Sequence, residues 1–387
     1  MIIGIDAANL RGGGGVTHLV ELLRAAQPAM LGIDRVVVWG GKSTLNALDN
    51  GLWLDKRNPV MLDKGLLQRM FWQRYHLSQA ARDAGCDILF VPGGSYAGNF
   101  YPVVTMSQNL LPFEMRELMR YGVSFFTVKL LLLRLTQTRS FQKADGVIFL
   151  TGYAQDVVMS VTGKLPCKTC IVPHGLNHRF KQAPKLQKTF ADYDEVHPYR
   201  ILYVSIIEKY KHQWHVVDAV SVFRKQGLPI ILDLVGPAYS PALQRLNATI
   251  DRLDPKRSWV HYHGSIPFDE LHHHYAQADL GLFASSCENM PNILLETMAA
   301  GLPIACSNKG PMPEVLGTAG VYFDPEQPDD IVHALRQMID SPQLRTELAG
   351  ASYDRAQQYS WQRCANETFG FLAEIAQQTS GKTKKDV

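Results

Sequence analysis

The sequence has no run of about 18 uncharged apolar residues, the length that a membrane-spanning helix needs. It has only six cysteines among 387 residues, and Met1 leads directly into a strand-like apolar stretch instead of a signal peptide. Lys and Arg (39) nearly balance Asp and Glu (36), so the net charge of +3 does not call for nucleic acid as a partner. These features predict a protein of the reducing cytoplasm.

The sequence has two groups of metal-binding residue types, but neither has the spacing of a metal site. Cys167 and Cys170 form a single CxxC without a second pair nearby in the sequence. The three consecutive histidines of "ELHHHYAQ" would point in different directions on a helix. We therefore expect no metal and no other cofactor.

Apolar β-branched runs alternate with helical patterns along most of the chain. "RVVVWG" and "DILFVPG" indicate strands of a first half, and "RILYVSI" and "PIILDLVG" indicate strands of a second half. Helical patterns separate such runs, for example at residues 16–31, 214–226, 268–277 and 329–340. Strands that are apolar throughout and joined by helices predict parallel sheets covered on both faces, with ligands bound at the carboxyl ends of the strands.

The predicted organisation is two doubly wound α/β domains. A polar, proline-bearing stretch near residues 181–200 is typical of a linker. We expect an N-terminal domain at 1–185, a linker at 186–199, a second domain at 200–360, and a C-terminal helix at 361–380 that packs back on the first domain.

Two glutamates, Glu288 and Glu296, lie eight positions apart around a predicted helix start. "SCENM" reads as a loop and "PNILLETMAA" as a helix, with Pro291 in its first position and Gly301 just past its end. Backbone N–H groups around residues 289–293 would form an anion site. Glu296 would lie about 7–8 Å further along the axis, roughly the distance from a nucleotide's diphosphate to its ribose. On spacing alone, the ordinary explanation is favoured, with Glu288 as a capping acid and Glu296 as a surface residue, because pairs of glutamates are common.

The surroundings of this pair carry a family resemblance. "YAQADLGLFASSCENMPNILLETMAAGLPIACSNKGPMPEVLG" resembles the signature of retaining glycosyltransferase family 4, the group 1 glycosyltransferases, which use nucleotide sugars. "GGGG", "IVPHGLNHRF", "ILYVSIIEKYKHQ" and "YSWQRCANETF" extend the resemblance over most of the chain in the expected order. It implies the GT-B fold, in which two Rossmann-like domains face each other across a cleft.

The resemblance also implies roles for individual residues. Glu296 would hold the donor ribose, Glu288 would contact the donor sugar, and Lys211 would neutralise the diphosphate leaving group, where electrostatics helps catalysis most. Glu288 and Lys211 are therefore the expected catalytic pair. The other implied donor-binding positions are Asn289, Met290, Pro291, Asn292, Gly236, Gly264 and Ser265.

The first domain would supply the acceptor side. Its glycine loop, Gly13, Gly14 and Gly15, lies between a strand and a helix, where backbone can approach a diphosphate or an acceptor. This loop lacks both the GxGxxG spacing and the P-loop lysine. The remaining acceptor-side positions that the resemblance implies are Gln108, Asn109 and His174.

Two positions depart from the family pattern. The family usually has Gly-Arg after the first strand of the second domain, whereas this chain has Ser205 and Ile206, so one phosphate-binding cation is missing or is supplied elsewhere. Gln108 stands where many relatives carry a histidine, and an amide cannot act as a general base. That suits a mechanism in which the leaving diphosphate itself receives the proton of the acceptor.

The segment "FFTVKLLLLRLTQTRSFQK" (residues 125–143) contains four basic and no acidic residues. Two interpretations stay open, a partly buried surface helix and a helix that lies on an anionic membrane. With the resemblance, we predict transfer of a sugar to a glycan or polyprenyl-linked glycan in bacterial-type surface polysaccharide or O-antigen assembly, by a cytoplasmic protein in peripheral contact with the inner face of the cytoplasmic membrane. The alternatives are a GT-B nucleotide-sugar epimerase and a non-catalytic sugar-binding scaffold, which the two departures keep open.

Overall fold

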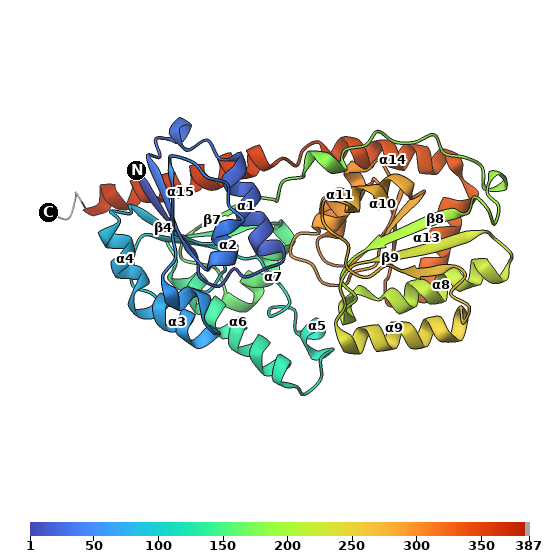
Figure 1. The fold of residues 1–387 in the computed structure, drawn as a ribbon, viewed down its shortest axis with the longest axis horizontal. Helices are drawn as coiled ribbons and strands as arrows, with labels where there is room; N and C mark the ends of the chain where they lie inside the picture. Colours follow the sequence, from blue (N-terminus) through green and yellow to red (C-terminus); the bar gives the residue numbers. More distant parts are fainter. Residues whose placement is uncertain (384–387) are drawn as a thin grey trace. The chain divides into compact units, whose positions relative to one another are not determined.

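The computed structural model describes residues 1–383. The chain folds into two compact units (Figure 1). Unit 1 comprises residues 1–118 and 123–175 together with the chain from Ser360 onward. Unit 2 comprises residues 119–122 and 176–359. Each unit contains one sheet in which every strand pair is parallel.

The sheet of unit 1 has seven strands in the order β3-β2-β1-β4-β5-β6-β7. The strands are β1 (Ile2–Ala7), β2 (Arg35–Gly40), β3 (Leu54–Arg57), β4 (Ile88–Val91), β5 (Val103–Met106), β6 (Gly146–Phe149) and β7 (Lys168–Ile171). The chain leaves β1 toward one edge of the sheet and later returns on its other side at β4. The carboxyl ends of β1 and β4 therefore flank the switch point, where doubly wound sheets bind ligands.

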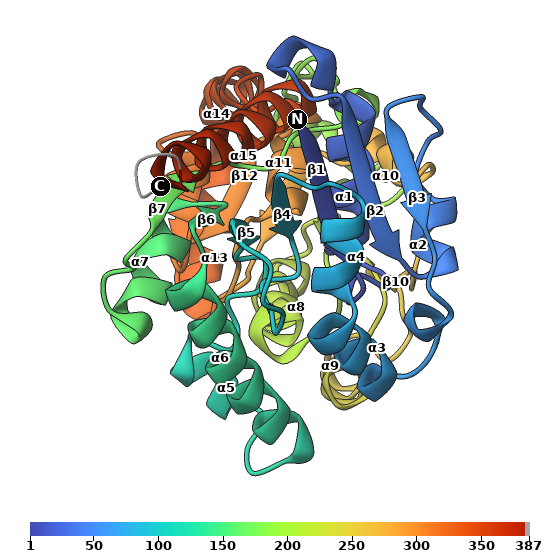
Figure 2. The same ribbon diagram turned by 90° about the vertical axis from the view of Figure 1, so that its left-hand side faces the viewer.

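Helices surround this sheet (Figure 2). They are α1 (Gly14–Ala25), η1 (Pro28–Leu31), α2 (Lys42–Asn46), η2 (Val60–Asp63), α3 (Leu66–Tyr75), α4 (Leu77–Asp83), α5 (Met115–Met119), α6 (Phe125–Lys143), α7 (Gly152–Thr162) and α15 (Trp361–Thr383). The last helix, α15, packs against α1 and β4 although more than 200 residues separate them in the chain. Large buried aromatic side chains such as Trp39, Phe90 and Phe149 fill the core, because the central strands present apolar residues on both faces.

The sheet of unit 2 has six strands in the order β10-β9-β8-β11-β12-β13. The strands are β8 (Tyr199–Val204), β9 (Ile230–Val235), β10 (Val260–Tyr262), β11 (Leu280–Phe283), β12 (Ile304–Ser307) and β13 (Val321–Phe323). Its helices are η3 (His178–Phe180), η4 (Phe190–Asp192), η5 (Lys209–Lys211), α8 (Gln213–Lys225), α9 (Ser240–Leu253), α10 (Leu271–Gln277), α11 (Asn292–Ala299), α12 (Met312–Leu316), α13 (Pro328–Asp340) and α14 (Pro342–Ala356). The switch point lies between β8 and β11.

Two parallel, doubly wound α/β sheets confirm the predicted fold class. The sequence runs did not identify β3 and β7, which are half-exposed edge strands without the continuous apolar pattern of the central ones. The helix predicted at 16–31 is wrong in its second half: α1 ends at Ala25 and a 3₁₀ turn starts at Pro28, whose missing N–H interrupts the helix. The helix predicted from residue 268 begins at Leu271.

The predicted linker segment, residues 186–199, lies along unit 2. Arg345, buried on α14, donates a hydrogen bond to the carbonyl of Lys188, and Tyr193 donates to Asp279 Oδ1 at 3.2 Å. Lys185 donates to the carbonyl of Ala278 at 3.0 Å. These contacts tie the segment to α14 and to the amino end of β11.

Candidate functional site

The predicted residues Lys211 and Glu288 of unit 2 lie in the loops at the carboxyl ends of β8 and β11. These loops are joined directly, because Ser286 N donates to the carbonyl of Tyr210 at 2.8 Å. A second bond joins His212 Nε2 and Ser286 Oγ at 3.0 Å. Burial lowers the pKa of His212 to about 3, so its ring is neutral at neutral pH. Two hydrogen bonds therefore hold the two loops together at the switch point of the sheet.

Lys211 of the first loop and Glu288 of the second contact each other. The ammonium of Lys211 donates to Glu288 Oε1, and both side chains are largely buried. The lysine is positioned through its backbone, whose carbonyl accepts from the hydroxyl of Tyr203 at 2.8 Å and whose N–H donates to Glu208 O at 3.0 Å. A primary ammonium beside a carboxylate forms a charge-assisted hydrogen bond, and either partner can be turned toward a ligand that offers a competing charge.

Glu296 lies on α11, and its side chain is buried. Tyr275 of α10 donates a hydrogen bond to Glu296 Oε2 at 3.1 Å. Burial raises the pKa of Glu296 to about 8, against the smaller opposing effects of the Tyr275 hydrogen bond and the positive charge of Arg179. At pH 7 this side chain is therefore mainly a neutral carboxylic acid that can both donate and accept hydrogen bonds.

The start of α11 differs from the sequence prediction. Pro291 is the N-cap residue and the helix begins at Asn292, so Pro291 is not in its first position. Asn292 N donates to the carbonyl of Met290 at 3.0 Å, which removes one of the N–H groups expected for an anion site. Asn289 and Met290 are buried in the preceding loop. Gly301 follows the helix at φ 63°, as predicted, and a Cβ there would lie 2.6 Å from the carbonyl oxygen of Gln182.

The predicted glycines of unit 2 lie where three loops meet. Gly236, after β9, has φ 143°, and a Cβ on it would lie 2.2 Å from the carbonyl oxygen of Ser205. Its N–H donates to the carbonyl of Gly264 at 2.7 Å. Gly264 has φ 68° with open space around its Cβ position, and Ser265 beside it is exposed. Only a glycine allows the close approach at 236, whereas 264 needs one for its backbone conformation.

Unit 1 brings together three of its predicted residues. A Cβ on Gly15 would lie 3.0 Å from Gln108 Oε1, and Gln108 Nε2 lies 3.2 Å from His18 Nδ1. The ring centroids of His18 and His174 lie 4.7 Å apart. Burial, and the charge that His174 would carry, hold the pKa of His18 well below its usual range, so this histidine is neutral.

The other predicted residues of unit 1 lie at the edge of this group. Gly13 is the N-cap of α1 at φ 66°, and the Cβ positions of Gly13 and Gly14 face open space. Asn109 is exposed, and its Oδ1 accepts from Leu111 N at 3.2 Å, a local turn contact.

Sequence reasoning missed several residues that shape these groups. Tyr275 and Glu208 touch or position predicted site residues, His212 and Ser286 join the two loops, and His18 connects Gln108 to His174. The spacing of His18, three positions after Gly15 on the expected helix, was the one available signal. The contact of Tyr275 with Glu296 joins residues 21 positions apart on two helices, which no local pattern encodes.

One cluster has metal-ligand residue types. Asp233, His261 and His263 offer ligand atoms that lie within 4.8 Å of one another. Asp233 is already paired, because Arg200 Nη1 donates to its Oδ2 at 2.5 Å and His263 Nε2 lies 2.7 Å from its Oδ1. The guanidinium charge would repel a dication, so we interpret the cluster as an ion-pair network.

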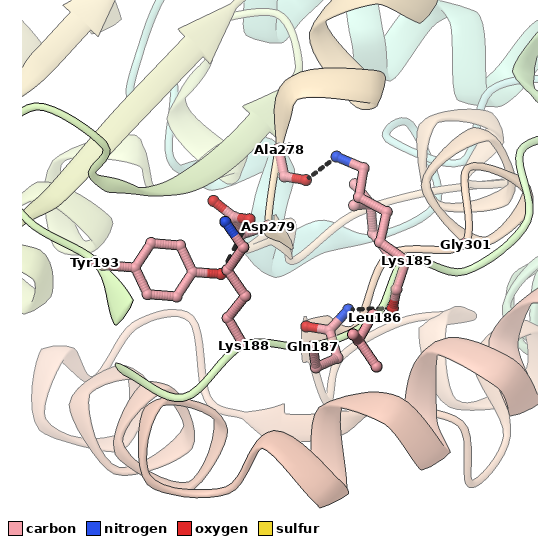
Figure 3. A pocket seen from close by; sticks show the side chains of 9 residues that line it. Lys185, Leu186, Gln187, Lys188, Tyr193, Ala278, Asp279 and Gly301 are labelled. Carbon is pink, nitrogen blue, oxygen red and sulfur yellow. Dashed lines mark hydrogen bonds between the residues drawn. The ribbon is translucent and has the colours of Figure 1, made fainter. Parts of the chain in front are cut away.

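A pocket of unit 2 lies away from these residues (Figure 3). Its lining combines residues 185–188 with Asp279, Gly301 and Leu302, which precede β11 and β12 and so mark the amino edge of the sheet. Tyr193 and Lys185 point into contacts with Asp279 and Ala278 there. None of the predicted site residues lines this pocket, and part of the 186–199 segment forms its wall.

Comparisons with known proteins find sequence similarity that is concentrated in unit 2. Residues 188–355 match the family described as glycosyl transferases group 1. The chain is 27% identical over 225 residues to O-antigen chain mannosyltransferase B of Escherichia coli, a match that covers 57% of this chain and 56% of the relative. The chain thus spans about half the length of that relative, and less of the next ones.

Solved structures match over the whole chain. Sucrose-phosphate synthase from Thermosynechococcus elongatus superposes with a TM-score of 0.74 at 16% identity, covering 100% of this chain and 98% of the other. HepE of Anabaena, solved in complex with UDP and glucose, gives 0.67 at 16% identity with full coverage of both chains. These likenesses show the fold, which is GT-B. The whole chain thus has this fold, and residues 188–355, in its second unit, are similar to the group 1 glycosyl transferases.

Proposed function

We propose that the protein is a retaining glycosyltransferase that moves a sugar from a nucleotide-diphosphate sugar to a glycan or lipid-linked glycan. The observation that carries this proposal is the direct contact of Lys211 with Glu288 at the switch point of unit 2, with buried Glu296 on the helix that follows. All three residues lie within the segment that matches the family, residues 188–355.

The donor would bind along the β8 and β11 loops. Glu296 would bind the ribose, Glu288 the sugar hydroxyls, and the backbone of residues 289–292, Gly236, Gly264 and Ser265 would frame the rest. The likeness to HepE, which was solved with UDP and glucose, supports a nucleoside diphosphate as the donor's leaving group. In this arrangement the diphosphate replaces Glu288 as the ion-pair partner of Lys211. Glu288 can then accept hydrogen bonds from the hydroxyl groups of the sugar.

The chemical step needs little beyond positioning and charge. The bond from the anomeric carbon to the phosphate oxygen breaks, and the acceptor oxygen bonds to that carbon on the same face. The acceptor's proton passes to the departing phosphate oxygen. Lys211 stabilises the negative charge that develops on the diphosphate. Gln108 cannot serve as a base, and neutral His18 is buried behind it, so a route through the leaving group fits these residues.

The acceptor would bind at the glycine loop of unit 1, near Gly13–Gly15, Gln108, Asn109 and His174. We infer a glycan or polyprenyl-linked glycan of surface polysaccharide assembly, because the curated relative is an O-antigen mannosyltransferase. Such an acceptor is presented at the inner face of the cytoplasmic membrane, where the protein would work as a peripheral enzyme without a metal. Within residues 1–383, no helix combines the length and hydropathy needed to cross a bilayer.

Donor binding and turnover test the proposal separately. A thermal-shift screen against UDP, GDP, ADP and dTDP and their sugar conjugates should raise the melting temperature with one base family, since a ligand that binds only the folded state stabilises it. Glu296→Ala should abolish the shift, and Lys211→Ala should reduce transfer to a glycan acceptor at least a hundredfold. Lys225→Ala, an exposed lysine at the end of α8, is the control and should change neither.

The rival functions give different products. An epimerase would release free nucleotide and an altered sugar without any acceptor. A sugar-binding scaffold would show the thermal shift but no turnover. Unchanged binding and transfer in both site variants would refute the assignment of these residues.

A further inference from the structure

The helix α6 of unit 1 exposes its apolar residues and buries polar ones. Phe125 is 87% exposed and Leu132 is 59% exposed, and Val128 and Leu135 are also exposed. These four residues follow the spacing i, i+3, i+7, i+10 and so lie on one stripe of the helix. The opposite side, which packs into the unit, consists of Thr127, Leu130, Gln137, Ser140 and Phe141. A surface helix of a soluble domain has the reverse arrangement.

The neighbouring helix α3 has the same property. Leu67 is 80% exposed, and Met70 and Phe71 on the same stripe are exposed as well. Both helices form hydrogen bonds with one short loop, residues 95–97. Arg74 of α3 donates to Ala97 O at 2.9 Å, and Ser140 of α6 accepts from Tyr96 N at 2.8 Å. Both helices lie at the lower edge of unit 1 in Figures 1 and 2.

The charges on these helices have one sign. Neither α3 nor α6 contains Asp or Glu. Lys129 and Arg139 lie on the exposed stripe of α6, four positions after Phe125 and seven after Leu132, and both are exposed. A stripe of large apolar side chains edged by cations alone is complementary to an anionic lipid surface, since headgroup phosphates neutralise the cations while acyl chains receive the apolar groups. A second copy that met these stripes with its own would bring cations against cations, because both helices lack Asp and Glu.

We propose that the exposed stripes of α3 and α6 form one docking surface for an anionic phospholipid bilayer. Leu67, Phe71, Phe125, Val128, Leu132 and Leu135 enter the boundary between headgroups and acyl chains, and Lys129 and Arg139 bind headgroup phosphates. In the proposed function, on which this purpose rests, the surface brings the enzyme to a lipid-linked acceptor. The binding itself requires neither donor nor acceptor.

Vesicle flotation tests the surface. The purified full chain should float with vesicles of phosphatidylglycerol and phosphatidylethanolamine at about 0.1 M salt, and bind vesicles of phosphatidylcholine at least tenfold more weakly. The double variants Phe125→Glu/Leu132→Glu and Leu67→Glu/Phe71→Glu should each bind the anionic vesicles at least tenfold more weakly than the wild type. The control Leu52→Glu/Leu186→Glu adds two charges at exposed leucines elsewhere and should float like the wild type.

The outcomes separate this inference from the proposed function. Wild-type protein that stays at the bottom of the gradient, or glutamate variants that float like it, would overturn the surface. Loss of a sedimenting dimer in the α6 variant, without vesicle binding by the wild type, would also overturn it, in favour of a second copy as the occupant. Nucleotide thermal shifts measured on the same variants should equal the wild-type shift. Flotation without any nucleotide shift would leave the docking surface standing and count against the proposed transferase.

Discussion

A Glu296→Gln variant should become increasingly more stable than the wild type as the pH rises. The folded state raises the pKa of Glu296 from 4.5 to about 8, because the carboxylate would be buried away from water. Between these two pH values the folded protein holds one proton that the unfolded chain releases. The free energy of unfolding of the wild type therefore falls as the pH rises, and this loss is complete above about pH 8. Glutamine has no proton to lose and can still accept the hydrogen bond from Tyr275.

The size of the effect follows from the shift. Each pH unit inside the window costs the wild type about 1.4 kcal/mol relative to the variant. From pH 5.5 to pH 7.5 the difference therefore grows by about 3 kcal/mol. For a unit of this size, 1 kcal/mol corresponds to roughly 2–4 °C, so the melting temperatures should diverge by roughly 6–12 °C.

Scanning calorimetry at pH 5.5, 6.5, 7.5 and 8.5 measures this divergence. The difference in melting temperature should be smallest at pH 5.5 and should grow progressively up to about pH 8. Glu347→Gln on α14 is the matched control, because that glutamate is exposed, and its offset should be the same at every pH. A constant difference between wild type and Glu296→Gln would refute the claim that Glu296 is buried as a neutral acid.

Three further predictions concern the same region. Donor binding through an ionised Glu296 should release close to one proton per molecule at pH 7, detected by calorimetry in buffers of different ionisation enthalpy, and Glu296→Gln should release none. Ile206→Arg, which restores the cation usual in the family, should tighten nucleotide binding roughly tenfold through a charged hydrogen bond to phosphate, whereas Ile206→Gln should not. Gly236→Ala should destabilise the fold by about 2–3 kcal/mol in chemical denaturation because its Cβ meets the Ser205 carbonyl, while Gly264→Ala, with open space, should cost about 1 kcal/mol.

The fold could be predicted from the sequence because its signals are local. Central strands such as "RVVVWG" and "PIILDLVG" are apolar on both faces, which only a covered parallel sheet explains. Element ends were less accurate where one residue decides them, as at Pro28 and Pro291. Edge strands such as β7 carry no continuous apolar run, so their pairing depends on a neighbour that the sequence does not identify.

For the candidate site, the sequence predicts a set of residues but not their contacts. The family resemblance names Lys211, Glu288 and Glu296 one by one. It does not say that Lys211 and Glu288 bind each other, since 77 positions separate them. It also does not say that Glu296 is neutral, because that depends on burial and on the hydroxyl of Tyr275.

If the site binds a donor as proposed, these contacts account for its stability with Ile206 where the family pattern has an arginine. The charge of Lys211 is balanced by Glu288, and Glu296 carries little charge at pH 7, so the loops at the switch point need no second cation to fold. In the proposed function, a donor diphosphate would change this balance because it would bring negative charge to Lys211 and displace Glu288. The displaced carboxylate must then find new donors, and the hydroxyl groups of a sugar are the donors that arrive with the diphosphate. On this proposal, phosphate recognition and sugar recognition would be coupled through the Lys211–Glu288 ion pair, and a nucleoside diphosphate without its sugar would leave Glu288 without a replacement partner.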